Sequence, residues 1–182
     1  MYTNLSENRI GVENWYLACH KAGKHNAFKA QMFLSESGIP VFIPQMFFRQ
    51  PRSDRPGQYR KKLELLFPGY LFIYFNFEEH SFSKILCCPG ISHFVRFGGA
   101  IKPLNDMIID ELMQVTKTID SDESGINECS HNLQAVNCKK NNNITELQRE
   151  EFKLIVQEKN SETRSLLFFD FIETIVSVKE RP

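Results

Sequence analysis

The last 37 residues, 146–182, constrain the fold most strongly, because they carry an apolar face but are too few to bury it in a core of their own. If these segments are helical, their spacing places the apolar residues on one side, namely Phe152, Ile155, Val156, Phe168, Phe171, Ile172 and Ile175. The same segments are rich in aromatic and β-branched residues, so periodicity alone leaves helix and strand open. In either conformation the apolar face has to be covered, and we expect the front of the chain to cover it.

The front of the chain, residues 1–117, mixes strand-like and helix-like segments without the regular spacing of βαβ units. Aromatic and aliphatic runs predict strands at 15–20, 41–48, 70–75 and 93–97, and Pro44 predicts a bulge or an edge within the second of them. Helical spacing and capping signals predict helices at 21–37, 77–88 and 105–117. The predicted class is α+β, with a mainly antiparallel sheet flanked by helices. The polar segment 118–145 is predicted to be a flexible linker to the small C-terminal domain, 146–182.

Charge is distributed unevenly along the chain. Residues 1–104 hold 13 Lys and Arg against 7 Asp and Glu, whereas residues 105–182 hold 9 against 15. Two basic segments stand out, a predicted helix start with Lys21, Lys24, His25 and Lys29, and a loop or hairpin tip at 49–62. Lysines at a helix N-terminus bind phosphates, which favours a nucleic-acid partner. A merely solvated basic face is the alternative.

The sequence offers no credible catalytic set or metal site, and we expect neither an enzyme nor a cofactor. Cys19 and His20 are neighbours on a predicted strand, so their side chains point to opposite faces and cannot form a nucleophile–base pair. Cys129, His131 and Cys138 lie close in sequence but lack the paired spacing and the fourth ligand of a zinc site.

The polar start of the chain and its odd number of cysteines predict a cytoplasmic protein with reduced thiols. Five cysteines occur without any CxxC spacing, which disfavours a disulfide framework. No apolar run reaches the roughly 18 residues that a membrane-spanning helix needs. We therefore expect no contact with a membrane.

Three motifs resemble a known family, in its order and approximate spacing. They are Trp15-Tyr16-Leu17, the run Leu66-Phe67-Pro68-Gly69-Tyr70-Leu71-Phe72, and the run from Pro89 to Gly98. The first two resemble the N-terminal domain of NusG proteins, and the third resembles the RfaH-type paralogues, which act on particular operons. The resemblance covers residues 14–115 and extends less strongly to residues 144–167.

The resemblance implies a monomeric elongation and antitermination factor that binds RNA polymerase and the non-template DNA strand. The apolar surface that grips the β′ clamp helices would consist of Phe67, Tyr70, Phe72, Ile109 and Leu112. His80 and Ser81 would contact the β gate loop. The implied DNA-contacting residues are Lys21, Lys24, His25, Gln31 and Lys84.

The resemblance also implies that the tail is a helical hairpin packed on the N-terminal domain, where it hides the polymerase site. The expected interdomain residues are Glu64, Arg164, Phe152, Ile155, Val156, Phe168, Phe171 and Ile172, with an ion pair between Glu64 and Arg164. After release, such tails refold into a KOW β-barrel that contacts a small-subunit ribosomal protein. Leu147 and Glu151 replace the turn glycines of that barrel, which should penalise it.

Two other functions remain alternatives to this autoinhibited factor. A general NusG-like elongation factor would need no inhibitory tail. A stand-alone single-stranded nucleic-acid-binding module would need no apolar surface around Tyr70 and Phe72.

Overall fold

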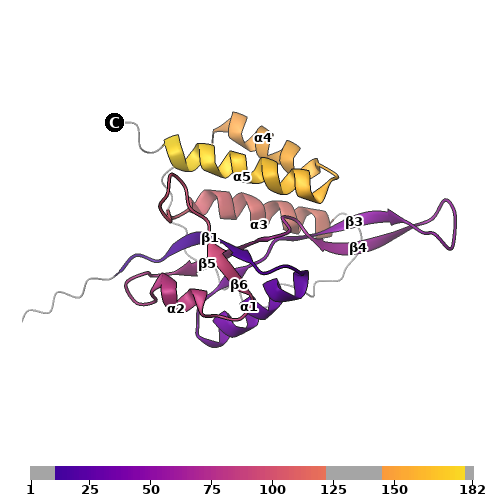
Figure 1. Ribbon diagram of the computed structural model, residues 1–182. Helices are drawn as coiled ribbons and strands as arrows, with labels where there is room; N and C mark the ends of the chain where they lie inside the picture. Colours follow the sequence, from indigo (N-terminus) through magenta and orange to yellow (C-terminus); the bar gives the residue numbers. More distant parts are fainter. Residues whose placement is uncertain (1–10, 122–144, 179–182) are drawn as a thin grey trace, which may run out of the picture.

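A computed structural model describes residues 11–121 and 145–178. Its centre is a four-stranded antiparallel sheet in the order β2-β5-β1-β6. These strands are β1 (Asn14–His20), β2 (Val41–Phe42), β5 (Tyr70–Phe75) and β6 (Ile91–Phe94). Helices α1 (Lys24–Glu36) and α2 (Phe82–Leu86) cover one face. Helices α3 (Asp106–Ser121), α4 (Glu146–Gln157) and α5 (Ser161–Val178) lie on the other (Figure 1). The predicted α+β class is confirmed.

The alternation of side chains along β1 explains why the sheet is covered on both faces. Trp15 and Leu17 point into the apolar cluster shared with α3, α4 and α5, while Tyr16 and Ala18 point into the cluster shared with α1. All four are at most 2% exposed. A strand that is apolar at consecutive positions requires a layer on each side.

The strand predicted at 41–48, with a bulge or an edge at Pro44, is two separate strands in the structure, because the chain leaves the sheet at Ile43 and Pro44. Val41 and Phe42 pair with β5, and the chain then enters β3 (Gln45–Pro51), which pairs only with β4 (Tyr59–Leu65) among the described strands. Proline has no N–H for a ladder, and the Pro44 carbonyl instead accepts a hydrogen bond from Leu66 N at 2.8 Å. The basic segment 49–62 therefore forms the outer strands and tip of a long hairpin.

The helix predicted at 77–88 is much shorter in the structure, where α2 begins only at Phe82. The Asn76 side chain accepts a hydrogen bond from Glu78 N at 3.0 Å and so stabilises a turn where a helix was expected. Ser81 then caps α2, because its hydroxyl accepts a hydrogen bond from Lys84 N at 3.3 Å.

Helix α3 begins as predicted after Asn105, whose side chain accepts a hydrogen bond from Met107 N at 3.2 Å. The helix continues to Ser121, so the first residues of the predicted linker 118–145 belong to it. Cys129, His131 and Cys138 lie outside the described residues.

The ambiguous tail forms two helices, α4 and α5. Thr145 and Gln148 form a capping box at the start of α4, in which Gln148 N donates to the Thr145 hydroxyl at 3.2 Å. A short turn then leads into α5, and the two helices place their apolar faces on the sheet side. Within the described residues, no helix is both long and apolar enough to cross a membrane.

Candidate functional site

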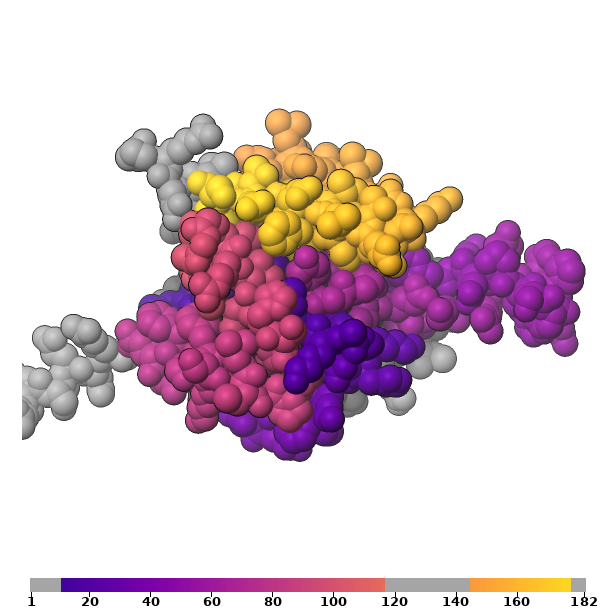
Figure 2. Space-filling model, in the orientation of Figure 1, coloured from indigo at the N-terminus to yellow at the C-terminus, as the bar shows by residue number. Residues whose placement is uncertain are grey.

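The five residues expected to bind RNA polymerase lie on the face of the sheet that carries α3, α4 and α5. We call Phe67, Tyr70, Phe72, Ile109 and Leu112 the covered surface. Four of them are at most 1% exposed, and Tyr70 is half-buried. The space-filling view shows the C-terminal helices seated directly on the body of the protein (Figure 2). The covered surface is therefore closed to any other protein in this conformation.

Phe168 of α5 makes the central contact with the covered surface. Its ring stacks on Phe67 with 3.9 Å between ring centroids and 15° between the planes. It meets Phe72 edge-on at 6.0 Å, and Phe152 of α4 lies 6.5 Å from it. Because Phe168 is 0% exposed, its burial contributes strongly to the docking of the tail.

The other apolar residues expected between the domains lie in the same cluster as Phe168. These residues, each at most 5% exposed, are Phe152, Ile155, Val156, Phe171 and Ile172. The cluster joins them to Trp15, Leu17 and Ile108 of the N-terminal part. The tail and the front of the chain thus share one apolar core.

Arg164 in the first turn of α5 is fully buried at this interface. Its Nε donates to the Leu66 carbonyl oxygen at 2.6 Å, and its Nη1 donates to the carbonyl oxygen of Glu158. The guanidinium also lies 4.7 Å from the centroid of the Phe48 ring. Burial lowers the pKa of Arg164, and the carboxylates of Glu64 and Glu158 partly oppose this effect.

The predicted ion pair between Glu64 and Arg164 is not formed in the structure. The Glu64 carboxylate pairs with Lys62, which stands two residues away on the same face of β4, at 2.6 Å. This local pair stays partly exposed and so avoids the desolvation that a buried carboxylate would suffer. The Nε and Nη1 atoms of Arg164 donate to main-chain carbonyls instead, whereas its Nη2 is buried with no hydrogen-bond partner among the described residues.

Polar contacts that the sequence did not reveal also join the tail to the N-terminal part. Arg149 of α4 pairs with Glu111 of α3 at 2.8 Å. The Ser165 hydroxyl lies 3.0 Å from the Ser161 carbonyl oxygen within α5 and 3.3 Å from the Pro68 carbonyl oxygen, and its single proton can be donated to either. Arg149 and Glu111 stand 38 residues apart on separate helices. Only the packing of α4 on α3 brings them together, so no pattern along the chain could have identified them.

Three of the predicted DNA-contacting residues, Lys21, Lys24 and His25, are exposed at the start of α1. The first turn of this helix contains no acidic residue, so the lysines and the helix dipole both favour a phosphate there. Gln31 is placed differently, because its Nε2 donates to the Val41 carbonyl at 3.1 Å and ties α1 to β2. This bond gives Gln31 a structural role in addition to any contact with DNA.

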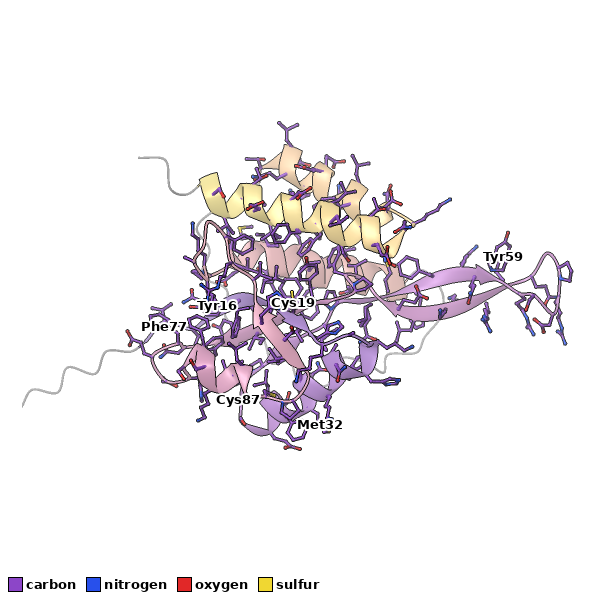
Figure 3. All side chains as sticks on the ribbon, in the orientation of Figure 1. Tyr16, Cys19, Met32, Tyr59, Phe77 and Cys87 are labelled. Atoms are coloured by element: carbon purple, nitrogen blue, oxygen red, sulfur yellow. The ribbon has the colours of Figure 1, made fainter. Side chains whose placement is uncertain are left out.

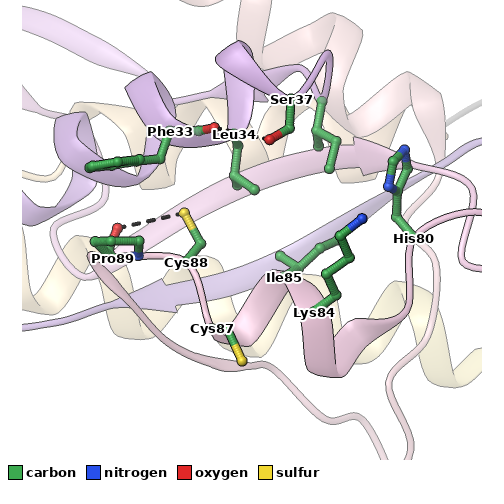
Figure 4. A pocket seen from close by; sticks show the side chains of 10 residues that line it. Phe33, Leu34, Ser37, His80, Lys84, Ile85, Cys87, Cys88 and Pro89 are labelled. Atoms are coloured by element: carbon green, nitrogen blue, oxygen red, sulfur yellow. Dashed lines mark hydrogen bonds between the residues drawn. The ribbon is translucent and has the colours of Figure 1, made fainter.

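His80 and Lys84 line a cavity of about 230 Å³ between α1 and α2, and Ser81 is the residue just before α2. Figure 4 shows Lys84 and His80 at the same end of this cavity. The His80 Nδ1 atom is buried and has no hydrogen-bond partner among the described residues. The Ser81 hydroxyl accepts a hydrogen bond from Lys84 N as the cap of α2. This bond helps to hold the first turn of the helix that carries Lys84.

His20 and Cys19 do not form a catalytic pair. The His20 Nε2 accepts a hydrogen bond from Gly69 N at 3.1 Å, so its Nδ1 carries the proton and donates to the Lys21 carbonyl at 2.7 Å. Both ring nitrogens are thus used by the main chain. Burial raises the pKa of Cys19 to about 11, which is the reverse of what a nucleophile needs.

We expect Cys19 to react far more slowly than exposed Cys87 with a maleimide at pH 8 (both are labelled in Figure 3). Only the thiolate reacts, and a pKa near 11 lowers its fraction by about two orders of magnitude relative to an ordinary thiol. Peptide mass spectrometry of the labelled protein measures both rates. Comparable rates for the two cysteines at pH 8 would contradict the burial of Cys19.

Two comparisons with known proteins bear on the family of this chain. A family model described as "Transcription termination factor nusG" matches residues 13–113. The chain is also similar to a solved structure titled "Domain interaction in Thermotoga maritima NusG", with 19% identity, a TM-score of 0.40 and an alignment over 59% of each chain. It therefore matches less than two thirds of that relative's length. Because the family model covers more than half of the 182 residues, this chain belongs to the NusG family.

Proposed function

We propose that this chain is an RfaH-like, operon-specific transcription elongation factor that is held inactive by α4 and α5. Its N-terminal part would bind the β′ clamp helices and the β gate loop of RNA polymerase, together with the non-template DNA strand, and so suppress pausing and termination. NusG-family proteins are non-enzymatic transcription factors, so the proposal requires no catalytic group.

The observation that carries the proposal is the burial of the covered surface by the chain's own tail. Phe67 and Phe72 are 1% and 0% exposed, and Phe168 contacts both rings. Clustered aromatic side chains are the usual anchors of a protein interface. A polymerase helix can reach them only after α4 and α5 have left, so binding has to be coupled to release of the tail.

The position of the basic residues supports recruitment by DNA before release. Lys21 and Lys24 are exposed near α1, which covers the face of the sheet opposite to α4 and α5 (Figure 1). DNA can therefore bind while the polymerase surface is still covered. In this scheme the DNA element selects the operon, and the polymerase contact follows.

Refolding of the tail into a KOW β-barrel that contacts a ribosomal protein stays a prediction of the resemblance. Two features of the tail favour its helices. The capping box of Thr145 and Gln148 stabilises the start of α4 by about 1 kcal/mol. Leu147 and Glu151 stand where the family's barrel has glycines, and both are exposed on α4.

Tyr70→Ala tests the polymerase contact. The change is made in a chain that ends at Ser121, in which the covered surface is no longer hidden because α4 and α5 are absent. We expect it to weaken binding to core RNA polymerase roughly 30-fold, which corresponds to the loss of about 2 kcal/mol for an interface anchor. Tyr59→Ala is the matched control, since Tyr59 lies near the tip of the β3–β4 hairpin. Equal affinity of the Tyr70→Ala and Tyr59→Ala proteins would count against the proposed surface.

A further inference from the structure

The cavity between α1 and α2 has a floor that belongs to the core of the protein. Leu34, Ile39 and Ile85 line it, are at most 5% exposed and are part of the apolar cluster beneath α1. Gly90 lets the chain after α2 pass close to α1, because a Cβ at this position would clash with the Asn26 carbonyl oxygen. The fold therefore holds both walls of the cavity in place.

The two ends of the cavity differ in polarity. Phe33 and Pro89 line one end, whereas Lys84 and His80 line the other (Figure 4). None of the ten residues that line the cavity is Asp or Glu, so the lining contains no carboxylate to balance the Lys84 charge. Among the residues that the structure describes, the Lys84 ammonium has no hydrogen bond or ion pair. The cavity is thus apolar along most of its length and cationic at one end.

His80 adds a second polar group beside Lys84. Its Nδ1 atom is buried without a hydrogen-bond partner in the described part of the chain. A buried polar atom in this state is unfavourable, and most such atoms in proteins have a partner. A ligand oxygen at this end of the cavity would provide the missing partner once the imidazole turns toward it.

We propose that this cavity binds a small carboxylic acid with an apolar body. The carboxylate would lie between the Lys84 ammonium and the His80 imidazole, where charge-assisted hydrogen bonds are strong. The body would lie against Leu34, Ile85 and Phe33. An apolar cavity of about 150 Å³ is large enough for a benzene ring. The cavity of about 230 Å³ therefore has room for a ring or a branched chain that carries a carboxylate.

The lining favours such an acid over a nucleobase or an inorganic anion. A nucleobase presents hydrogen-bonding groups around its edges, and the apolar floor of Leu34, Ile39 and Ile85 would leave some of them unpaired. An inorganic anion would gain nothing from this floor, because it has no apolar surface to bury. Only a ligand that is both anionic and apolar uses the two ends of the cavity.

The inference stands without the proposed contacts to polymerase and DNA, but one consequence of it rests on the proposed function. If Lys84 contacts the non-template strand, an acid bound to Lys84 competes with DNA for the same ammonium group. A small acid in the cavity would then weaken the recruitment of the factor by DNA.

The test is a titration of the full chain with phenylacetate and, in parallel, with isovalerate, followed through the amide chemical shifts in two-dimensional NMR spectra. We expect saturable binding with a dissociation constant on the order of 0.1–1 mM, as is usual for ligands of this size. The largest shifts should fall in residues 33–39 and 80–88, which contain the lining residues other than Pro89.

Lys84→Gln is expected to weaken the binding of phenylacetate about tenfold, because it removes a charge-assisted hydrogen bond. Lys29→Gln is the matched control, since Lys29 is an exposed lysine of α1 that does not line the cavity. It should bind phenylacetate like the wild type. Phenylacetamide has nearly the same shape without the charge, and the wild type should bind it about tenfold more weakly than the acid.

Three results would overturn the proposal. In the first, neither acid causes saturable shifts in the wild-type chain. In the second, Lys84→Gln binds phenylacetate as tightly as Lys29→Gln, or the wild type binds phenylacetamide as tightly as the acid, so that charge plays no part. In the third, a deoxynucleoside monophosphate binds more tightly than phenylacetate and shifts the same amides, which would make the cavity part of the DNA contact. The Tyr70→Ala test of polymerase binding uses none of these probes, so the two proposals can fail separately.

Discussion

Replacing Phe168 by alanine is expected to release the tail and to let the full chain bind core RNA polymerase without any DNA. The ring is fully buried and lies against Phe67, Phe72 and Phe152. Truncation of a buried phenylalanine costs about 3–5 kcal/mol. If this loss falls on the docked state alone, the ratio of undocked to docked tail rises by about two to four orders of magnitude. Biolayer interferometry with immobilised polymerase measures the gain.

Leu166→Ala is the matched control for this experiment, because Leu166 stands on the same helix but is 66% exposed. It should leave the tail docked and polymerase binding weak. The maleimide reaction of Cys19 gives an independent readout, since Cys19 packs against the same apolar cluster. A Phe168→Ala chain in which neither polymerase binding nor Cys19 labelling increases would show that α5 is not what closes the covered surface.

Arg164→Ala is expected to produce the second largest opening of the tail. The change removes two hydrogen bonds from a charged donor, to the Leu66 and Glu158 carbonyls, and leaves the buried Leu66 oxygen without this partner. Hydrogen bonds to charged groups contribute about 1.5–3 kcal/mol each, so we expect a loss of about 3 kcal/mol. The loss should appear as faster hydrogen exchange of the amides of α5 in the full chain.

Glu64→Gln separates the main-chain hydrogen bonds of Arg164 from its electrostatic attraction to Glu64. Glu64 is partly exposed and paired with Lys62, so its substitution should change tail docking by at most about 1 kcal/mol. An effect of Glu64→Gln as large as that of Arg164→Ala would mean that a direct Glu64–Arg164 ion pair controls the closed state. That result would contradict the arrangement in the structure.

The elements that the sequence predicted well are those whose local pattern and tertiary environment agree. Strand β1 and helix α1 combine a continuous apolar pattern with clear end signals, and Gly23, at φ 92°, explains why the helix begins at Lys24 and not at Lys21. The segment 41–48 and the short helix α2 were mispredicted. Pro44 indicated an irregularity in the first segment, but not that the chain would start a second sheet there; the start of α2 depends on one side-chain hydrogen bond of Asn76, which no periodicity encodes.

The tail could not be assigned from its own sequence, because its apolar residues satisfy both periods. In the structure the tail is helical, and Phe168 and Phe152, from two adjacent helices, pack together next to Phe67. Dependence on the folded arrangement also explains why the predicted ion pair between Glu64 and Arg164 is absent. Resemblance located Arg164 at the interface, but the partners of its guanidinium are main-chain oxygens, whose positions depend on the fold and not on residue identity.

Autoinhibition by the tail, as proposed above, is tested most directly by comparing the full chain with a chain ending at Ser121 for binding to core RNA polymerase without DNA. Circular dichroism first establishes that both proteins are folded. We predict that the shorter chain binds and that the full chain binds at least tenfold more weakly, as expected if docking of the tail is worth 1.4 kcal/mol or more. Equal affinity of the two chains would contradict autoinhibition and would favour a general elongation factor of the NusG family.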